Sequence, residues 1–184
     1  MLKIIIIFIA LNLYNPALTS ITEDIISKMK ITNNLSFNFT QTVDDKSENG
    51  KCTLEYPKKI FCEYDSANKK IIVSNGKSLV IKTNNGGSYY IYPLDKTPLE
   101  YLLDKEYLIS KIQMLEPSDI DNKYLNFKIF ENNNEINIFF DKKSLNLIGW
   151  QTEDMYQNLS VTFISSVKIN QKINEKKFIL PQNN

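Results

Sequence analysis

The chain has 184 residues, 22 of them basic and 21 acidic, and its net charge of +1 gives no electrostatic case for nucleic acid or a strongly acidic partner. It contains no histidine, and all of its basic residues are lysines. The composition therefore lacks the commonest general base, the commonest metal ligand and the bidentate phosphate clamp. This argues against metalloenzymes and against Ser-His or Cys-His hydrolases.

The N-terminus has the layout of an export signal. Met1-Leu2-Lys3 is a charged start, residues 4–13 are apolar, and small or polar residues follow through Ser20. The apolar run is too short to span a bilayer. The sequence predicts a signal peptide over residues 1–19, with cleavage between Ala17 and Ser20, and a single exported domain over residues 20–184. A buried N-terminal strand or helix is the alternative.

The exported part is predicted to begin with a helix and to continue as strands. Apolar residues at 21, 25, 26 and 29 form a helical stripe over residues 21–30. Beyond it, apolar and polar residues alternate, which is typical of half-buried antiparallel strands. Turn residues such as Asn75-Gly76 separate the runs, and apolar residues 178–180 in the polar tail could add an edge strand. The predicted strands are 35–43, 51–56, 60–65, 69–74, 78–83, 88–92, 111–116, 123–131, 135–141, 145–152 and 159–167.

The two cysteines flank a predicted hairpin with a Pro-Lys-Lys turn. Cys52 and Cys62 would lie opposite each other on one face of that hairpin, close enough for a disulfide. Export would favour such a bond, which would stabilise the fold by roughly 3 kcal/mol in the chain-entropy model. Two buried free thiols are the alternative, and the spacing is not that of a redox-active Cys-x-x-Cys pair.

A strand-to-helix transition over residues 89–103 stands out. Tyr89 to Tyr92 favour a strand, and Pro93 cannot donate to the ladder. Thr97 is a candidate helix cap, Pro98 fits the first helical position, and Glu100 fits a capping box. The helix is predicted over residues 98–109. Leu99, Leu102 and Leu103 share one of its faces and should cover an apolar surface.

These elements predict one antiparallel domain with two or three helices. The apolar face of the sheet could pack on a second sheet as a sandwich, or the sheet could curl beneath the helices. The acidic groups at 44–45 and 119–121 are interpreted as solvated turns and not as metal ligands. No metal, cofactor or catalytic pair is expected, so the chain is predicted not to be an enzyme.

Several motifs, in order along the chain, resemble those of the outer-membrane lipoprotein carrier protein family, LolA. Phe39-Thr40-Gln41 is similar to the Phe-x-Gln of the family's first strand. The run 50–64 resembles its Gly-to-Tyr hairpin, and the run 73–79 is similar to its Val-Ser-Asp-Gly-Lys turn. The runs 92–103 and 145–150 resemble its Pro-Leu-x-x-Thr-Pro-Leu segment and its later tryptophan strand.

The resemblance implies a mainly β fold with lid helices (α+β), an incomplete antiparallel β-barrel whose concave apolar face is covered by short α-helices. It implies a periplasmic monomer that binds the acyl chains of lipoproteins released by an inner-membrane ABC transporter. An outer-membrane lipoprotein receptor would take the cargo, and no nucleic acid or cofactor is involved. Two alternatives remain: a lipid-binding or envelope-stress sensor on a similar half-barrel, and a secreted structural β-domain without a cavity.

The resemblance also implies where cargo binds, and two departures from the family bear on it. Tyr56 stands where the family has an arginine that holds the lid closed, and Cys62 stands where it has tryptophan. Thr97 and Pro98 should form the lid hinge. The predicted acyl-binding residues lie on the concave face and on the lid: Phe37, Phe39, Leu54, Tyr56, Leu79, Ile81, Tyr90 and Trp150, with Leu99, Leu102 and Leu103 above them.

Overall fold

The computed structural model describes residues 16–83, 88–132, 134–153 and 158–182. Most of the predicted signal peptide lies outside these ranges. In the described part of the chain, eleven strands form one antiparallel sheet. The strands are β1 Asn34–Val43, β2 Lys46–Glu55, β3 Lys59–Tyr64, β4 Ile71–Asn75, β5 Ser78–Lys82, β6 Tyr89–Pro93, β7 Ser118–Ile120, β8 Tyr124–Glu131, β9 Asn134–Asp141, β10 Leu147–Glu153 and β11 Leu159–Ile169.

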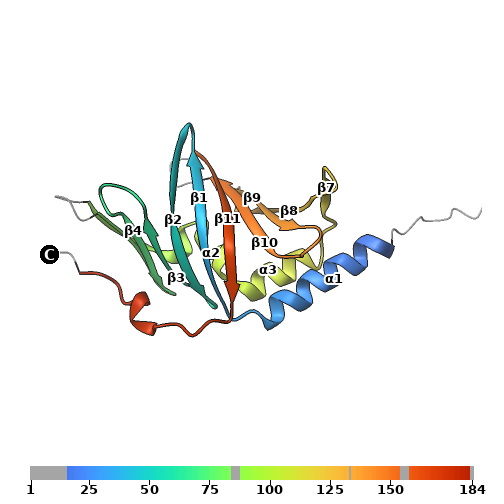
Figure 1. Ribbon diagram of the computed structural model, residues 1–184, viewed down its shortest axis with the longest axis horizontal. Helices are drawn as coiled ribbons and strands as arrows, with labels where there is room; N and C mark the ends of the chain where they lie inside the picture. Colours follow the sequence, from blue (N-terminus) through green and yellow to red (C-terminus); the bar gives the residue numbers. More distant parts are fainter. Residues whose placement is uncertain (1–15, 84–87, 133, 154–157, 183–184) are drawn as a thin grey trace, which may run out of the picture.

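The sheet is curved and open. Its strand order is β6-β5-β4-β3-β2-β1-β11-β10-β9-β8-β7, so β1 and β11 join two meanders in the middle (Figure 1). Strands β6 and β7 lie at opposite ends of this order and are not neighbours. The predicted incomplete antiparallel barrel is thereby confirmed, and the sandwich alternative is wrong.

Period-two alternation determines which side chains face the concave side. On β8, Leu125, Phe127 and Ile129 are at most 2% exposed, whereas Tyr124 and Phe130 on the other face are 39% and 66% exposed. On the same concave face, the Phe39 ring of β1 packs closely over a glycine of the neighbouring strand β2. A Cβ atom on Gly50 would lie 2.7 Å from the Phe39 ring, so glycine lets this aromatic ring pack over the neighbouring strand.

Helices cover the concave face over two apolar clusters. The α-helices are α1 Pro16–Ile31, α2 Leu99–Leu103 and α3 Lys105–Ile112, and the 3-10 helices are η1 Leu94–Lys96 and η2 Glu175–Phe178. Figure 1 shows α1 and α3 beside the β8–β10 half of the sheet. The cluster between them includes Ile25, Ile109, Ile112, Phe127 and Ile138. A second cluster, with Leu94 and Leu103 above Leu54 and Leu79, lies beneath η1 and α2.

The region after α2 differs from the prediction. The expected strand 111–116 is wrong, because Leu108, Ile109 and Ile112 form one buried helical face and α3 continues to Ile112. Strand β7 instead occupies residues that were interpreted as a turn. The helix predicted over 98–109 is divided at Asp104, whose carboxylate accepts the Tyr107 amide at 3.0 Å and caps α3.

The C-terminal tail packs on the convex face and does not add the expected edge strand. Its η2 turn buries Phe178, which is 4% exposed. Lys177 Nζ donates to Thr53 Oγ1 at 3.3 Å, and Lys59 Nζ lies 3.2 Å from Glu175 Oε2. The η2 turn packs against β3 and β4, and the buried Phe178 ring holds the tail there. Figure 1 shows the tail passing from the end of β11 toward these strands.

Candidate functional site

The larger apolar cavity lies between η1–α2 and the concave sheet and has a volume of about 190 Å³. We call it the lid cavity. Its ceiling is formed by Thr97, Pro98, Leu99 and Leu102. Most of its floor and walls is apolar: Phe39, Cys52, Ile60, Cys62, Ile72, Leu79 and Trp150. One end is polar: Gln41, Tyr64, Thr152, Glu153, Ser160 and Thr162.

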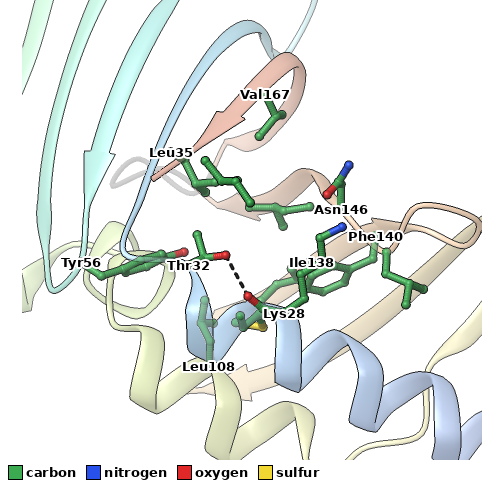
Figure 2. A pocket seen from close by; sticks show the side chains of 13 residues that line it. Lys28, Thr32, Leu35, Tyr56, Leu108, Ile138, Phe140, Asn146 and Val167 are labelled. Carbon is green, nitrogen blue, oxygen red and sulfur yellow. Dashed lines mark hydrogen bonds between the residues drawn. The ribbon is translucent and has the colours of Figure 1, made fainter. Parts of the chain in front are cut away.

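A smaller cavity of about 50 Å³ lies between the sheet and the helices α1 and α3. Figure 2 shows Tyr56 at its side, with Thr32 and Leu108 near the helices and Leu35 on a strand. The Thr32 hydroxyl is occupied by a 2.8 Å hydrogen bond to the Lys28 carbonyl (Figure 2). This volume holds no more than a few water molecules, so the cavity is a packing space between the two clusters.

Five of the predicted acyl-binding residues line the lid cavity, namely Phe39, Leu79, Leu99, Leu102 and Trp150. Phe37, Leu54 and Leu103 are buried in the adjoining cluster, which the lid covers. The Phe37 ring packs edge-on against Trp150, with 6.2 Å between the ring centroids. These three side chains therefore support the cavity wall without lining it.

Two predicted residues lie away from the lid cavity. The register pairs Ile81 with Tyr90, so both belong to the concave side of strands β5 and β6. Because β6 is at the edge of the sheet, however, Tyr90 is 50% exposed and stacks on Tyr92. Tyr90 and Ile81 are not among the residues that line the cavity.

The predicted hinge leads from η1 into α2, but it is not capped as expected. The buried Thr97 hydroxyl donates to the Leu94 carbonyl at 2.8 Å, and Pro98 occupies the N-cap position without a side-chain cap. Because α2 begins at Leu99, its N-cap position falls on Pro98, which has no side-chain oxygen with which to cap the helix. Glu100 does not reach back in a capping box either, because its carboxylate pairs with Lys58.

Lys58 joins the β2–β3 turn to the lid. Its Nζ lies 2.5 Å from Glu100 Oε1 and 3.1 Å from Asp104 Oδ2, and its amide donates to the Leu103 carbonyl at 2.9 Å. Hydrogen bonds to Glu100 and Asp104 raise the pKa of Lys58 above its ordinary value. We call these contacts the Lys58 latch. The sequence pattern predicts only that Lys58 lies in a hairpin turn. The signal of a shared cation is the pair Glu100 and Asp104, two acids one helical turn apart.

Tyr56, where the resemblance places an arginine that closes the lid, lies beside α3. Its ring lies 5.7 Å from Lys105 Nζ at the start of α3 and lines the smaller cavity. Burial raises the pKa of Tyr56 to about 12, so the side chain is neutral at physiological pH. The contact with the end of α2 is instead made by Lys58, two residues further along.

The model of the outer membrane lipoprotein carrier protein LolA family matches residues 30–180. The chain belongs to the LolA family. The match spans the sheet, the lid cavity and the Lys58 latch. No curated protein sequence matches this chain.

Solved structures show the same LolA fold. A domain from Vibrio parahaemolyticus, described as an outer membrane lipoprotein-sorting protein, has 7% sequence identity and a TM-score of 0.52, covering 89% of this chain and 97% of that domain. LprF from Mycobacterium bovis has 14% identity and a TM-score of 0.50, covering 87% and 96% of the two chains. At these identities the likeness establishes the fold alone.

Cross-linking of the cavity floor is a feature of this LolA-family chain. Cys52 and Cys62 are direct cross-strand partners on β2 and β3 and form a disulfide, with 4.1 Å between their Cα atoms. Both line the lid cavity. The disulfide therefore stands where the resemblance places a packed tryptophan.

Metal sites and membrane-spanning helices are two other features that bear on function. Within them, no group of three or more His, Cys, Asp or Glu side chains could hold a metal ion. In the same part of the chain, no helix is both long enough and apolar enough to cross a bilayer. The LolA-like fold is a binding fold, and the lid cavity is the larger of its two mainly apolar cavities among the described residues.

Proposed function

We propose that residues 20–184, after removal of a signal peptide over residues 1–19, form a periplasmic lipoprotein carrier. It would take the acyl chains of lipoproteins released by an inner-membrane ABC transporter and deliver them to an outer-membrane receptor. The observation that carries the proposal is an apolar cavity covered by a short helical lid, to which Lys58 adds an ion-pair contact. Membership of the LolA family supports it.

The energetics of acyl chains explain why such a cavity suits carriage. Each buried methylene contributes about 0.8 kcal/mol, so a sixteen-carbon chain exposed to water costs on the order of 10 kcal/mol. At about 190 Å³ the lid cavity is smaller than the roughly 300–1,000 Å³ of ordinary ligand pockets. The lid must therefore move to admit an acyl chain, and part of the binding free energy goes into opening it. The free energy spent on opening the lid is recovered when the cargo leaves, which favours release to a receptor.

Carriage requires no bond to be made or broken, and the residues at the cavity fit that requirement. Its hydroxyls belong to Tyr64, Thr97, Thr152, Ser160 and Thr162, and the chain has no histidine to activate them. We therefore propose a binding protein and not an enzyme.

Acyl binding is tested with a triacylated lipopeptide and the fluorescence of Trp150, the one tryptophan of the chain, which lines the cavity. We expect a saturable spectral change that Leu99→Asn weakens at least tenfold, because an amide in an apolar cavity loses hydrogen bonds to water. Ile91→Asn is the matched control, since Ile91 is 55% exposed on an edge strand. Absence of any saturable change would contradict every lipid-binding function.

Carriage is then separated from fixed sensing by a release assay. Inner-membrane vesicles that contain the transporter and a triacylated lipoprotein are incubated with ATP and the protein. We expect soluble lipoprotein in complex with the wild-type chain and a reduced amount with Leu99→Asn. Binding of the lipopeptide without release from vesicles would favour the sensor alternative.

A further inference from the structure

The lid cavity has two chemically different ends. Beneath α2 its walls are leucine, isoleucine, phenylalanine and the disulfide, whereas the far end carries Gln41, Ser160 and Thr162 from the central strands β1 and β11. Ser160 and Thr162 are 6% and 3% exposed. Burying hydroxyls beside an apolar cavity costs free energy unless they form hydrogen bonds. The hydrogen bonds of this end therefore indicate what it could bind.

A chain of hydrogen bonds fixes the orientation of these groups. Tyr64 Oη donates to Gln41 Oε1 at 2.8 Å, which directs the amide nitrogen of Gln41 toward β11. Gln41 Nε2 donates to Ser160 Oγ at 3.2 Å and to Thr162 Oγ1 at 3.4 Å. Both hydroxyls accept in these bonds, so each keeps its own proton to donate.

Contacts around Tyr64 hold this series of hydrogen bonds in place. Lys70 Nζ lies 3.7 Å from the centroid of the Tyr64 ring and pairs with Glu48. Burial raises the pKa of Tyr64 well above its ordinary value, so its hydroxyl remains a donor at physiological pH. The polar end is thus pre-oriented before any ligand arrives, and pre-orientation lowers the entropic cost of binding.

The charges around this end limit the ligand class. Among the described residues that line the cavity, Glu153 is the one charged group and none is a lysine. A phosphate or a free carboxylate would meet a like charge at Glu153, and the nearby Lys70 is already paired with Glu48. An uncharged hydrogen-bond acceptor avoids this charge repulsion and can accept from the hydroxyls of Ser160 and Thr162.

We propose that this polar end is a subsite for the ester carbonyl oxygens of a neutral acylated glycerol. The hydroxyls of Ser160 and Thr162 donate to the carbonyls, and the acyl chains extend toward Leu99 and Leu102 beneath the lid. This inference rests on the proposed function and adds a selectivity to it. The cavity prefers neutral acyl esters to free fatty acids and to anionic phospholipids.

The test compares short-chain diacylglycerol with its dialkyl ether analogue, which has the same chains but no carbonyl oxygens. Binding is measured by Trp150 fluorescence at concentrations below micelle formation. We expect the wild-type chain to bind the ester about tenfold more tightly, the effect of one or two neutral hydrogen bonds. In Ser160→Ala/Thr162→Val the preference should disappear while the affinity for the ether is unchanged.

Thr42→Val is the matched control, because Thr42 is on β1 but its hydroxyl bonds Ser47 at the exposed surface. Ser160→Ala alone serves if the double variant does not fold. Equal binding of ester and ether by the wild-type chain, or tighter binding of phosphatidylglycerol than of diacylglycerol, would overturn the subsite and leave acyl carriage intact. Binding of neither lipid would instead count against the proposed function.

A second binding experiment identifies which kind of molecule supplies the glycerol ester. A peptide with an N-terminal diacylglyceryl cysteine is compared with free diacylglycerol of the same chain length. We expect the peptide to bind more tightly than free diacylglycerol. We also expect Ser160→Ala/Thr162→Val to weaken the binding of both ligands by the same factor. This result assigns the subsite to lipoproteins. A double variant that leaves both ligands unaffected overturns the assignment of the hydroxyls.

Discussion

At the scale of single residues, Lys58 decides how firmly the lid is held. Its side chain is 28% exposed, and partly exposed ion pairs contribute about 0.2–1 kcal/mol each. The amide hydrogen bond to Leu103 adds a contact that does not depend on the side chain. Contacts of this strength help to keep α2 over the cavity in the free protein. Burial of an acyl chain contributes far more free energy and can therefore displace the helix.

We predict that Lys58→Met opens the lid more often without unfolding the protein. Backbone amides of residues 99–103 should exchange about threefold faster, and lipopeptide affinity should rise by a similar factor, because the closed state loses up to about 1 kcal/mol. Hydrogen exchange with mass spectrometry and a lipopeptide titration measure the two effects. Lys59→Met is the control, since Lys59 pairs with Glu55 and Glu175 and not with the lid. Identical behaviour of the two variants would refute the latch.

At the scale of elements, α3 is tied to strand β8 by a carboxylate. Glu131 Oε2 accepts from Tyr107 Oη at 2.9 Å and lies 2.8 Å from Lys111 Nζ. The hydrogen bonds of Lys111 and Tyr107 lower the pKa of Glu131 below its ordinary value. A lowered native pKa makes stability depend on pH. The stabilisation from ionised Glu131 is present above the pKa of the unfolded chain, about 4.3. It is lost as pH falls through the lower pKa of the folded protein.

We therefore predict that Glu131→Gln lowers the unfolding midpoint at neutral pH and that the difference from wild type shrinks as pH falls below about 4. Glu106→Gln is the control, because Glu106 lies on α3 next to Tyr107 but is exposed. Thermal unfolding from pH 3 to 8 measures both variants. A Glu131→Gln difference that stays constant over this range would show that the tie is not electrostatic.

The disulfide belongs to the same scale, because it joins β2 to β3 beneath the lid cavity. Closing a loop of this size contributes roughly 3 kcal/mol, or about 6–12 °C in the unfolding midpoint of a domain of this length. We predict such a loss for Cys52→Ala/Cys62→Ala by calorimetry. Wild-type protein under reductant is the control and should show a similar loss. An unchanged midpoint, or two free thiols by mass under non-reducing conditions, would contradict the cross-link.

Local pattern predicted most of the strands, and its failures have identifiable causes. The alternation of Ile112 and Met114 mimics a strand over 111–116, but Ile112 also continues the helical spacing of Leu108 and Ile109, and tertiary burial favoured the helix. The Lys58 latch joins residues 42 positions apart in the sequence. A contact between residues so far apart leaves no periodic pattern in the sequence from which it could be predicted. The polar end of the cavity was missed because Gln41, Ser160 and Thr162 occupy ordinary strand positions.

At the scale of the whole molecule, an open sheet has two faces to cover. The concave face has the helices, whereas the convex face of β3–β5 has the C-terminal tail. Val73 and Val80 pair across β4 and β5 on that convex side and are at most 1% exposed. Phe178 of the tail is buried next to Lys59, 5.6 Å from the lysine Nζ to the ring centroid. The tail therefore functions as the outer layer of this half of the sheet.

We predict that Phe178→Ala releases this layer and lowers the free energy of unfolding by about 3 kcal/mol, the scale of a buried phenylalanine truncation. Ile179→Ala is a closely matched control, because Ile179 is the next residue but is 68% exposed. Denaturant unfolding measures the loss, and limited trypsin digestion at Lys176 and Lys177 should cut the folded Phe178→Ala chain first. Lipopeptide affinity should not change, because the lid cavity uses Ile60 and Cys62 on the opposite face of β3. Equal stability of the two variants would show that the tail is dispensable for the sheet, whereas a loss of lipopeptide binding in Phe178→Ala would show that the two faces are coupled.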